Sequence, residues 1–426
     1  MSIPRILTIM GSGETAPTMV STHRSLVSRL PRPVSATVID TPYGFQENAS
    51  ELAERAVKYF STSVTIDIEV AGLLRLVGDD VDPVGIERGL RRVADADYVF
   101  AGPGSPTYAL RQWTGSPVHA ILADKLRDGG IVTFASAAAL TLGSHTVPVY
   151  EIYKVGEEPR WEKGLDLLGD IGIKAAVIPH FDNAEGGHHD TRFCYLGEGR
   201  LAMLESMLPE DHFVLGIDEH TALVMDIDAG SASVTGNGTV TIRTRTSSRV
   251  FPSGTTIELS LLRDPHGDGD QSHPQVHVGA NARPAATAPT QELSGATSLG
   301  GVARECRADF DAAMAAGDAP TAVRAALGLE QAIDDWSADT TQSEDLDAAR
   351  AHLRAMISAL GDAAVDGLRD EREVVSPYVE AILAVRAIVR AEKRYDLSDV
   401  IRDRFAELHV EVRDTPDGVE WHLGES

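Results

Sequence analysis

The chain has 426 residues, of which 43% are apolar, and its formal net charge is −26 at pH 7. This length favours two domains joined by a linker, and this apolar content excludes a chain that is disordered throughout. The negative charge argues against broad, nonspecific binding of nucleic acid or of an anionic membrane, because both need many Lys and Arg contacts. A local basic face on one domain is still compatible with it.

The chain opens with MSIPRILTIMGSG, which leads directly into a predicted strand. It lacks the charged start, long apolar run and cleavage site of a signal peptide, and no stretch has the roughly 18 uninterrupted apolar residues of a membrane span. The two cysteines, Cys194 and Cys306, lie far apart and cannot form a disulfide framework. We therefore expect a cytoplasmic protein.

Short β-rich runs alternate with helical stretches over the first 180 residues. The predicted strands are 5–10, 35–40, 64–70, 98–101, 131–135 and 175–179, and the predicted helices are 46–59, 84–93, 117–128 and 161–168. This alternation predicts an α/β fold with a mostly parallel sheet and helices on both faces. Later β-rich runs at 222–227, 233–244 and 255–261, with a hairpin-like turn at 235–238, indicate an antiparallel β extension at one sheet edge.

The composition changes at residue 264. From 264 to 299, Gly, Pro, Ala, Ser and Gln replace the large apolar residues, which predicts a flexible linker. His266, His273 and His277 lie in this segment. They show no fixed ligand spacing, so a solvated linker is favoured over a metal-binding tract.

The remaining residues, 300–426, predict a small helical domain that ends in a β-hairpin. Apolar residues from 379 to 389 recur at intervals of three and four, as on an amphipathic helix. Strand-like runs at 409–413 and 419–423 flank a turn. The predicted domains are thus 1–263 and 300–426.

Ser136 lies where an apolar strand passes into a run of small, helix-forming residues. A serine in this place is presented on a tight turn above the sheet edge, and the next backbone N–H can stabilise an oxyanion. The same segment is explained equally well by a serine that only caps the helix. Ser136 is therefore a candidate nucleophile that needs support from the rest of the chain.

His180 follows the apolar strand 175–179, so we expect it at the same carboxyl edge of the sheet as Ser136. A serine needs a neighbouring base to become nucleophilic, and His is the usual one near neutral pH. The alternative is a buried His that bonds the backbone. With Ser136 in register, we favour His180 as the base.

Six segments of the chain occur in the order of the cyanophycinase and aspartyl dipeptidase family of serine peptidases. They are GSGE at 11–14, AGPGSPT at 101–107, SAAA at 136–139, PHF at 179–181, the arginines Arg192 and Arg200, and GIDEHTAL at 216–223. Residues 4–262 resemble this family, whose fold is similar to that of class I glutamine amidotransferases. The resemblance implies a serine peptidase whose oxyanion is held by the amides of Gly104 and Ala137.

The resemblance also suggests the remaining site residues. Glu151 follows Ser136 at the interval at which the dipeptidase branch places its triad acid, and Glu157 competes with it; a solvated carboxylate is the alternative for both. Arg192 and Arg200 would bind an anionic substrate group, because the guanidinium fork donates two parallel hydrogen bonds. A surface salt bridge explains Arg200 equally well.

Residues 180–192 are rich in groups that occur in functional sites. A divalent-metal site of His180, His188 or His189, and Asp190 is the alternative to an active-site loop. No HExxH spacing organises these residues, so we predict no metal and no cofactor.

Phe134 and Ala138 depart from the family, which usually has Gly at both positions beside the nucleophile. Each adds a Cβ where a tight turn favours none. Either the turn is reshaped, or the domain has lost its chemistry.

The end of the chain carries a second resemblance. Segments 390–404 and 410–421 resemble the C-terminal tRNA-binding region of bacterial cysteinyl-tRNA synthetases, over roughly residues 300–423. The HIGH and KMSKS signatures and the cysteine-binding zinc set are absent, so aminoacylation is not implied. The resemblance implies tRNA contact through residues 380–423.

Six basic residues would form a local basic face on this domain: Arg386, Arg390, Lys393, Arg394, Arg402 and Arg404. Acidic residues alternate with them, and the simpler interpretation is a solvated, ion-paired helix surface. A helical module for homodimerisation or docking is the alternative to tRNA binding.

These observations lead to one prediction and one alternative. The prediction is a serine-dependent hydrolase of an amide bond in a small acidic peptide or isopeptide, or of an aminoacyl ester, with a module that binds tRNA. The alternative is a noncatalytic tRNA- or protein-binding adaptor with a decayed hydrolase site.

Overall fold

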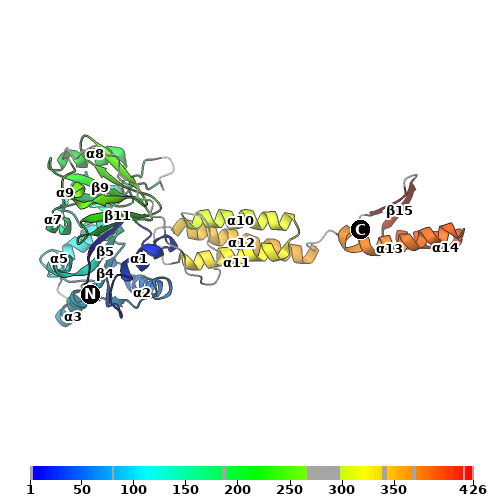
Figure 1. Cartoon of the computed structure of the whole chain (residues 1–426), viewed down its shortest axis with the longest axis horizontal. Coiled ribbons are helices and arrows are strands. Elements are labelled where there is room, and N and C mark those ends of the chain that lie inside the picture. Colours follow the sequence, from blue (N-terminus) through cyan, green and yellow to red (C-terminus); the bar gives the residue numbers. More distant parts are fainter. Residues whose placement is uncertain are drawn as a thin grey trace. The chain divides into compact units, whose positions relative to one another are not determined.

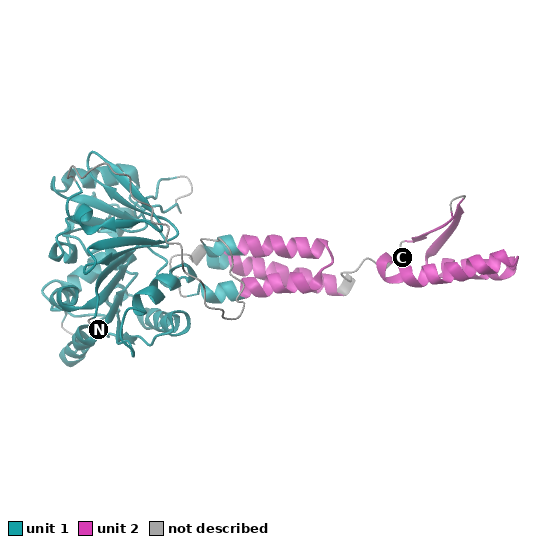
Figure 2. Cartoon of the chain, viewed as in Figure 1, with its two compact units in different colours: residues 1–302, 331–347 teal, residues 303–330, 348–426 magenta. Residues whose placement is uncertain are grey.

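The computed structural model describes residues 3–78, 81–184, 189–265, 298–337, 343–366, 371–415 and 418–424. It divides into two compact units, Met1–Val302 with Gln331–Asp347, and Ala303–Glu330 with Ala348–Ser426 (Figure 2). Most of the predicted linker lies outside the described residues, and the domain bounds that we drew from the sequence stay a prediction.

The first unit is built on an eight-stranded sheet of order β14-β11-β10-β1-β5-β4-β2-β3 (Figure 1). Its parallel strands are β1 (Arg5–Met10), β2 (Ala36–Ile39), β3 (Glu69–Val70), β4 (Tyr98–Ala101) and β5 (Gly130–Ala135). Beyond β1 the antiparallel strands are β10 (Thr221–Asp226), β11 (Ser231–Gly236) and β14 (Thr256–Glu258). The predicted mostly parallel sheet with a late antiparallel extension is confirmed. The hairpin predicted around 235–238 is wrong, because the strands before and after this turn belong to different sheets.

The predicted strand 175–179 does not join this sheet. It forms β8 (Ala175–Ile178) in a second sheet of order β13-β12-β9-β8, in which β8 and β9 (Phe213–Ile217) are parallel. Both neighbours of β5 are already strands, β1 and β4, so β5 has no free edge for β8. The antiparallel strands β12 (Thr239–Arg243) and β13 (Ser248–Pro252) complete the second sheet.

The central strands of the first sheet are buried on both faces. Leu7, Ile9, Val132 and Phe134 belong to one apolar cluster, whereas their chain neighbours, among them Ile6 and Ile131, belong to another. Around the two sheets lie α1 (Val20–Val27), α2 (Ala49–Tyr59), α3 (Pro83–Asp95), α4 (Pro106–Trp113), α5 (Val118–Asp128), α6 (Ser136–Leu140), α7 (Leu167–Asp170), α8 (Gly197–Met207) and α9 (Leu259–Arg263).

Two predicted elements differ from what the sequence pattern indicated. The strand predicted at 64–70 retains only Glu69 and Val70, because the chain first forms a π-helical turn, Phe60–Val64. The helix predicted at 161–168 is instead the short strand β7 (Glu162–Lys163), which pairs with β6 (His145–Thr146), followed by α7.

The second unit and the adjoining segments are helical up to a terminal hairpin, as predicted. The helices are α10 (Leu299–Ala315), α11 (Ala319–Asp335), α12 (Ser343–Asp366), α13 (Glu371–Ala391) and α14 (Tyr395–Glu407), and the hairpin pairs β15 (Val410–Thr415) with β16 (Gly418–Leu423). Val379 and Leu383 of α13 pack with Phe405, Val410 and Trp421 in a small core. Within the described ranges, no helix combines the length and the apolar character that crossing a bilayer requires.

His23 of α1 gives the first unit a dependence on pH. Its side chain is fully buried; Nε2 lies 2.7 Å from the Glu14 carbonyl oxygen and Nδ1 lies 2.7 Å from the Tyr98 hydroxyl. Burial lowers the pKa of His23 to about 4, although the hydrogen bond to Glu14 opposes the shift. Between pH 6.5 and 4 the unfolded chain therefore takes up a proton that the folded chain does not. The free energy of unfolding consequently decreases as the pH is lowered through this range.

We expect His23 to lower the free energy of unfolding by up to about 3 kcal/mol as the pH falls from 6.5 to 4. Urea unfolding at several pH values would measure this, with His23→Gln as the matched variant. The variant should be less stable at pH 7 but show a shallower loss towards acid. An equal acid dependence in both proteins would contradict the assignment.

Candidate active site

Ser136 lies at the point where β5 ends and α6 begins. Its backbone is left-handed, with φ of +49°, which is uncommon for a residue other than Gly. Such strain is retained where the surrounding structure fixes it, and it often occurs at functional sites. The turn directs the chain from the sheet edge into the helix, as a nucleophile turn requires.

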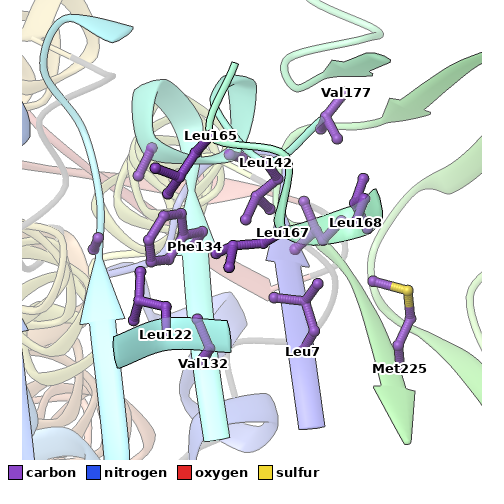
Figure 3. Packing of buried hydrophobic residues seen from close by; sticks show 14 of the residues in the cluster. Leu7, Leu122, Val132, Phe134, Leu142, Leu165, Leu167, Leu168, Val177 and Met225 are labelled. Carbon is purple, nitrogen blue, oxygen red and sulfur yellow. The ribbon is translucent and has the colours of Figure 1, made fainter. Parts of the chain in front are cut away.

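The side chains of Phe134 and Ala138, where the family usually has Gly, pack in the core. Phe134 and Ala138 are both fully buried, and the Phe134 ring centroid lies 5.8 Å from that of Trp113. Phe134 lies among Leu122, Leu165 and Leu167 (Figure 3). The left-handed turn at Ser136 is thus compatible with both side chains.

Three side chains from separate segments form a hydrogen-bonded row. Ser136 Oγ lies 3.0 Å from His180 Nε2, and His180 Nδ1 lies 2.8 Å from Glu219 Oε1. His180 follows β8 and Glu219 follows β9, and these parallel strands end at one edge of the second sheet. The geometry allows an imidazole to take a proton from a serine hydroxyl while a carboxylate fixes its other nitrogen.

The carboxylate beside His180 is not the one that we predicted. Glu151, in the π-helical turn Glu151–Val155, accepts a hydrogen bond from Thr107 Oγ1 at 2.7 Å. Glu219 was part of the family-like segment 216–223 but received no role from the sequence. Its position directly after an apolar strand was the available signal, and the pairing of that strand with β8 was what the sequence did not reveal.

Glu219 is held firmly against His180. Its amide donates to Asp182 Oδ1 at 2.7 Å, and Asn183 Nδ2 donates to its Oε1 at 3.1 Å. Burial alone would raise the pKa of Glu219, but the hydrogen bond and the charge of His180, together with the bond from Asn183, lower it. Glu219 is therefore charged at neutral pH and can stabilise an imidazolium at His180.

Asp182 adds a second acidic group beside this row. Burial raises its pKa to about 6, with further increases from the Asp218 and Glu219 charges and an opposing effect of the Glu219 amide. The carboxylates on this side of His180 thus create a negative local potential at neutral pH.

The loop that carries Gly104 lies against the start of α6. The Ala138 amide donates to the Gly102 carbonyl at 3.2 Å, and the Ser105 amide donates to the Pro42 carbonyl at 2.8 Å. Gly104 has φ of +139°, and a Cβ there would lie 2.1 Å from the Pro42 oxygen. Ala137 follows Ser136 in the first turn of α6, where amides have no acceptor within the helix. The oxyanion role of the Gly104 and Ala137 amides stays a prediction.

The two arginines differ in their surroundings. Arg192 forms a two-pronged ion pair with Asp190, with both N–O distances 2.8 Å, and its guanidinium lies over the Phe193 ring. Arg200 on α8 is partly exposed and has no ion pair within the described residues. The fork of Arg192 is therefore already occupied, and anion binding by either side chain stays a prediction.

One side of the row is closed by a left-handed turn. Phe193, Cys194 and Tyr195 have φ of 62°, 56° and 65°, and the Cys194 amide donates to the His180 carbonyl at 3.0 Å. The Tyr195 ring centroid lies 6.4 Å from that of His180 and 5.0 Å from that of Tyr153, on which it stacks. The Tyr195 ring thus lies near the imidazole, and His180 is only 6% exposed.

The alternative function predicted for residues 180–192 was a divalent-metal site. Among the residues that the structure describes, no group of three or more His, Cys, Asp or Glu is arranged to hold a metal ion. His188 and the linker histidines His266, His273 and His277 lie outside the described residues.

A second row of similar residues lies at the opposite end of β9. Ser144 Oγ is 3.2 Å from His212 Nε2, and His212 Nδ1 is 2.8 Å from Asp211 Oδ1. Ser144 Oγ also lies 2.9 Å from His145 Nδ1, and Ser144 is not at a strand-to-helix turn. Ser144 is therefore a suitable comparison for Ser136 when the reactivity of the two hydroxyls is measured.

The six basic residues of the C-terminal helices are mostly ion-paired. Arg386 is only 2% exposed and binds Asp414 through two hydrogen bonds of 2.8 and 3.0 Å, and Arg390 contacts the same carboxylate. The other pairs are Arg394–Asp396, Arg402–Asp399, Arg402–Asp403 and Arg404–Glu407. Arg386 therefore does not contribute to a surface basic face.

The end of the chain is similar to a known family of domains. Residues 372–421 match the family of the cysteinyl-tRNA ligase anticodon binding domain. The cysteine–tRNA ligase of Carboxydothermus hydrogenoformans is 45% identical over 49 residues, which are 12% of this chain and 10% of that protein. That of Desulfitobacterium hafniense is 39% identical over 84 residues, which are 19% of this chain and 18% of that protein. The chain thus spans less than a fifth of these relatives, and the resemblance predicted for its end is confirmed.

Two solved structures are similar to the larger part of the chain. One is a peptidase from an acI-B1 Actinobacterium, with 22% identity and a TM-score of 0.49, covering 60% of this chain and 98% of that chain. The other is a putative peptidase E protein from Listeria monocytogenes EGD-e, with 11% identity and a TM-score of 0.37. This match covers 55% of this chain and 98% of that chain.

Proposed function

We propose that the α/β part of the chain is a serine hydrolase that cleaves an amide bond in a small peptide or isopeptide. The observation that carries the proposal is the row Ser136–His180–Glu219, with distances of 3.0 and 2.8 Å. The left-handed Ser136 at a strand-to-helix turn supports it, because this geometry presents a hydroxyl at the sheet edge.

In the proposed reaction, Ser136 Oγ attacks the carbonyl carbon while its proton passes to His180 Nε2. The amides of Gly104 and Ala137 hold the oxyanion of the tetrahedral intermediate. His180 then gives the proton to the leaving amine as the C–N bond breaks, which leaves an acyl ester on Ser136. Water, deprotonated by His180, hydrolyses this ester; throughout, Glu219 accepts the Nδ1–H and stabilises the imidazolium.

The substrate is proposed from two different observations. The family resemblance favours an acidic residue, which Arg200 would meet, since Arg192 is already paired with Asp190. The match of residues 372–421 to an anticodon binding domain favours an aminoacyl ester as the second candidate, because the same groups cleave esters. A noncatalytic adaptor remains the alternative from another class.

Covalent labelling tests the proposal. Wild-type protein treated with a fluorophosphonate should gain one probe group, detected by intact mass spectrometry. Fragmentation of the tryptic peptide 128–154, which contains both Ser136 and Ser144, should place the added mass at Ser136. An unlabelled wild-type protein would favour the adaptor.

We further propose that the C-terminal module contacts tRNA. A gel shift with total tRNA should show binding that weakens strongly between about 50 and about 200 mM salt, because phosphate contacts release counterions. Arg404→Glu, at an exposed arginine of α14, should weaken binding several-fold, whereas Arg127→Glu on α5 is the matched control. A complex insensitive to salt, or equally weakened by both changes, would refute a phosphate-binding face on this module.

A further inference from the structure

A cavity separate from the Ser136 row opens between α2 and the loop that follows β3. Its volume is about 550 Å³, within the range of small-molecule sites. The inner wall is mostly apolar and is formed by Asp40, Ala49, Ala53, Val57, Val70 and Leu74. A cavity of this size and character suits a small apolar molecule.

One buried carboxylate lines this cavity, and a buried tyrosine packs against its lining residues Ala49 and Ala53. Asp40 follows β2 directly, is 2% exposed, and accepts the Leu73 amide through Oδ1 at 2.7 Å. Tyr43 is 3% exposed, and its hydroxyl has no hydrogen-bond partner among the described residues. Burial and the Asp40 charge both raise the pKa of Tyr43.

The charges around the cavity favour a cation. Asp40 in the wall and Glu54 at the rim are acidic. Lys58, the basic residue of the lining, lies 3.4 Å from Asp334 and is thus partly neutralised. An ammonium group can donate to a carboxylate, whereas an anion would meet two acidic groups.

We propose that this cavity binds a small apolar molecule that carries a primary ammonium group. The apolar body packs between Ala53, Val57 and Val70, and the ammonium group donates to Asp40. The proposal does not depend on the hydrolase function, because none of these residues belongs to the Ser136 row.

The cavity is nevertheless connected to the oxyanion loop. Asp40 and Tyr43 flank Pro42, whose carbonyl accepts the Ser105 amide at 2.8 Å and leaves no room for a Cβ at Gly104. On the other side, the Tyr108 hydroxyl donates to the Leu74 carbonyl at 2.9 Å. A bound ligand would therefore stabilise the segment against which the Gly104 loop packs.

Isopentylammonium, titrated into the full chain and followed by methyl NMR, tests the inference. Saturable shifts of the Val57 and Val70 methyl groups are expected, with millimolar affinity for so small a ligand. Asp40→Asn keeps an acceptor for the Leu73 amide but removes the charge, and it should raise Kd at least about ten-fold. Ala53→Leu fills the cavity and should abolish the shifts.

Glu47→Gln, at an exposed acid of the same region outside the lining, is the matched control and should leave Kd unchanged. The uncharged 3-methylbutan-1-ol should bind at least about ten-fold more weakly than the amine. Equal affinity for the alcohol and the amine, or an unchanged Kd in Asp40→Asn, would overturn the assignment of an ammonium ligand. No saturable shift up to about 50 mM would overturn the site itself.

Discussion

Ser136→Ala should abolish covalent labelling by a fluorophosphonate, with a fall in rate of at least about 10⁴-fold. The hydroxyl is the only part of Ser136 that the proposed reaction uses, and alanine keeps the Cβ that the turn already accommodates. The fold should therefore survive, which near-ultraviolet circular dichroism would verify. The labelling rate is measured with a fluorescent probe on purified protein.

Ser144→Ala is the matched control for this experiment. Ser144 lies 3.2 Å from His212, in a hydrogen-bonded row that resembles the one at Ser136 but lies at the other end of β9. We expect its labelling rate to equal that of the wild type. If Ser144→Ala lost the label and Ser136→Ala retained it, the nucleophile would be at the second row.

Glu219→Gln should lower the labelling rate by about 10²–10⁴-fold. Glutamine keeps the shape of the side chain but removes the negative charge that stabilises the imidazolium, and its amide can orient the ring with the wrong nitrogen protonated. Because the pKa of Glu219 is lowered, the carboxylate is charged throughout the neutral range, and the loss should persist from about pH 6 to 8.

Glu151→Gln separates the two candidate acids. Glu151 bonds Thr107 rather than His180, so its replacement should change the rate less than about ten-fold. The opposite result, a large loss for Glu151→Gln and a small one for Glu219→Gln, would restore the acid that the sequence suggested. Unfolding by urea, measured for both variants, guards against a loss that reflects stability alone.

The parts of the site that could be predicted are those fixed by local sequence. Ser136 and His180 each follow an apolar strand directly, and the carboxyl ends of parallel strands gather candidate residues at one edge. Glu219 follows the same rule, but its partner strand could be identified only once β8 had paired with β9. Glu151 was placed by its interval from Ser136, and an interval along the chain does not determine direction through an intervening π-helical turn.

The C-terminal arginines also show which features the sequence could predict and which it could not. Helix spacing identified the amphipathic character of α13, because that pattern repeats within one element. It could not reveal that Arg386 turns inward, since the Asp414 that binds it belongs to the hairpin after the next helix. Pairing across elements, unlike periodicity within one, has no short-range signature.

The Ser136 row also draws its members from two independent β-layers: the hydroxyl is anchored to the eight-stranded layer, while the imidazole and the carboxylate are anchored to the four-stranded one. A slippage of one layer against the other by a single ångström would break the hydroxyl–imidazole contact without melting either. On heating, the reactivity of Ser136 should consequently be lost at a lower temperature than that at which the helices and strands unfold. The labelling rate should therefore detect a displacement between the two sheets that circular dichroism does not.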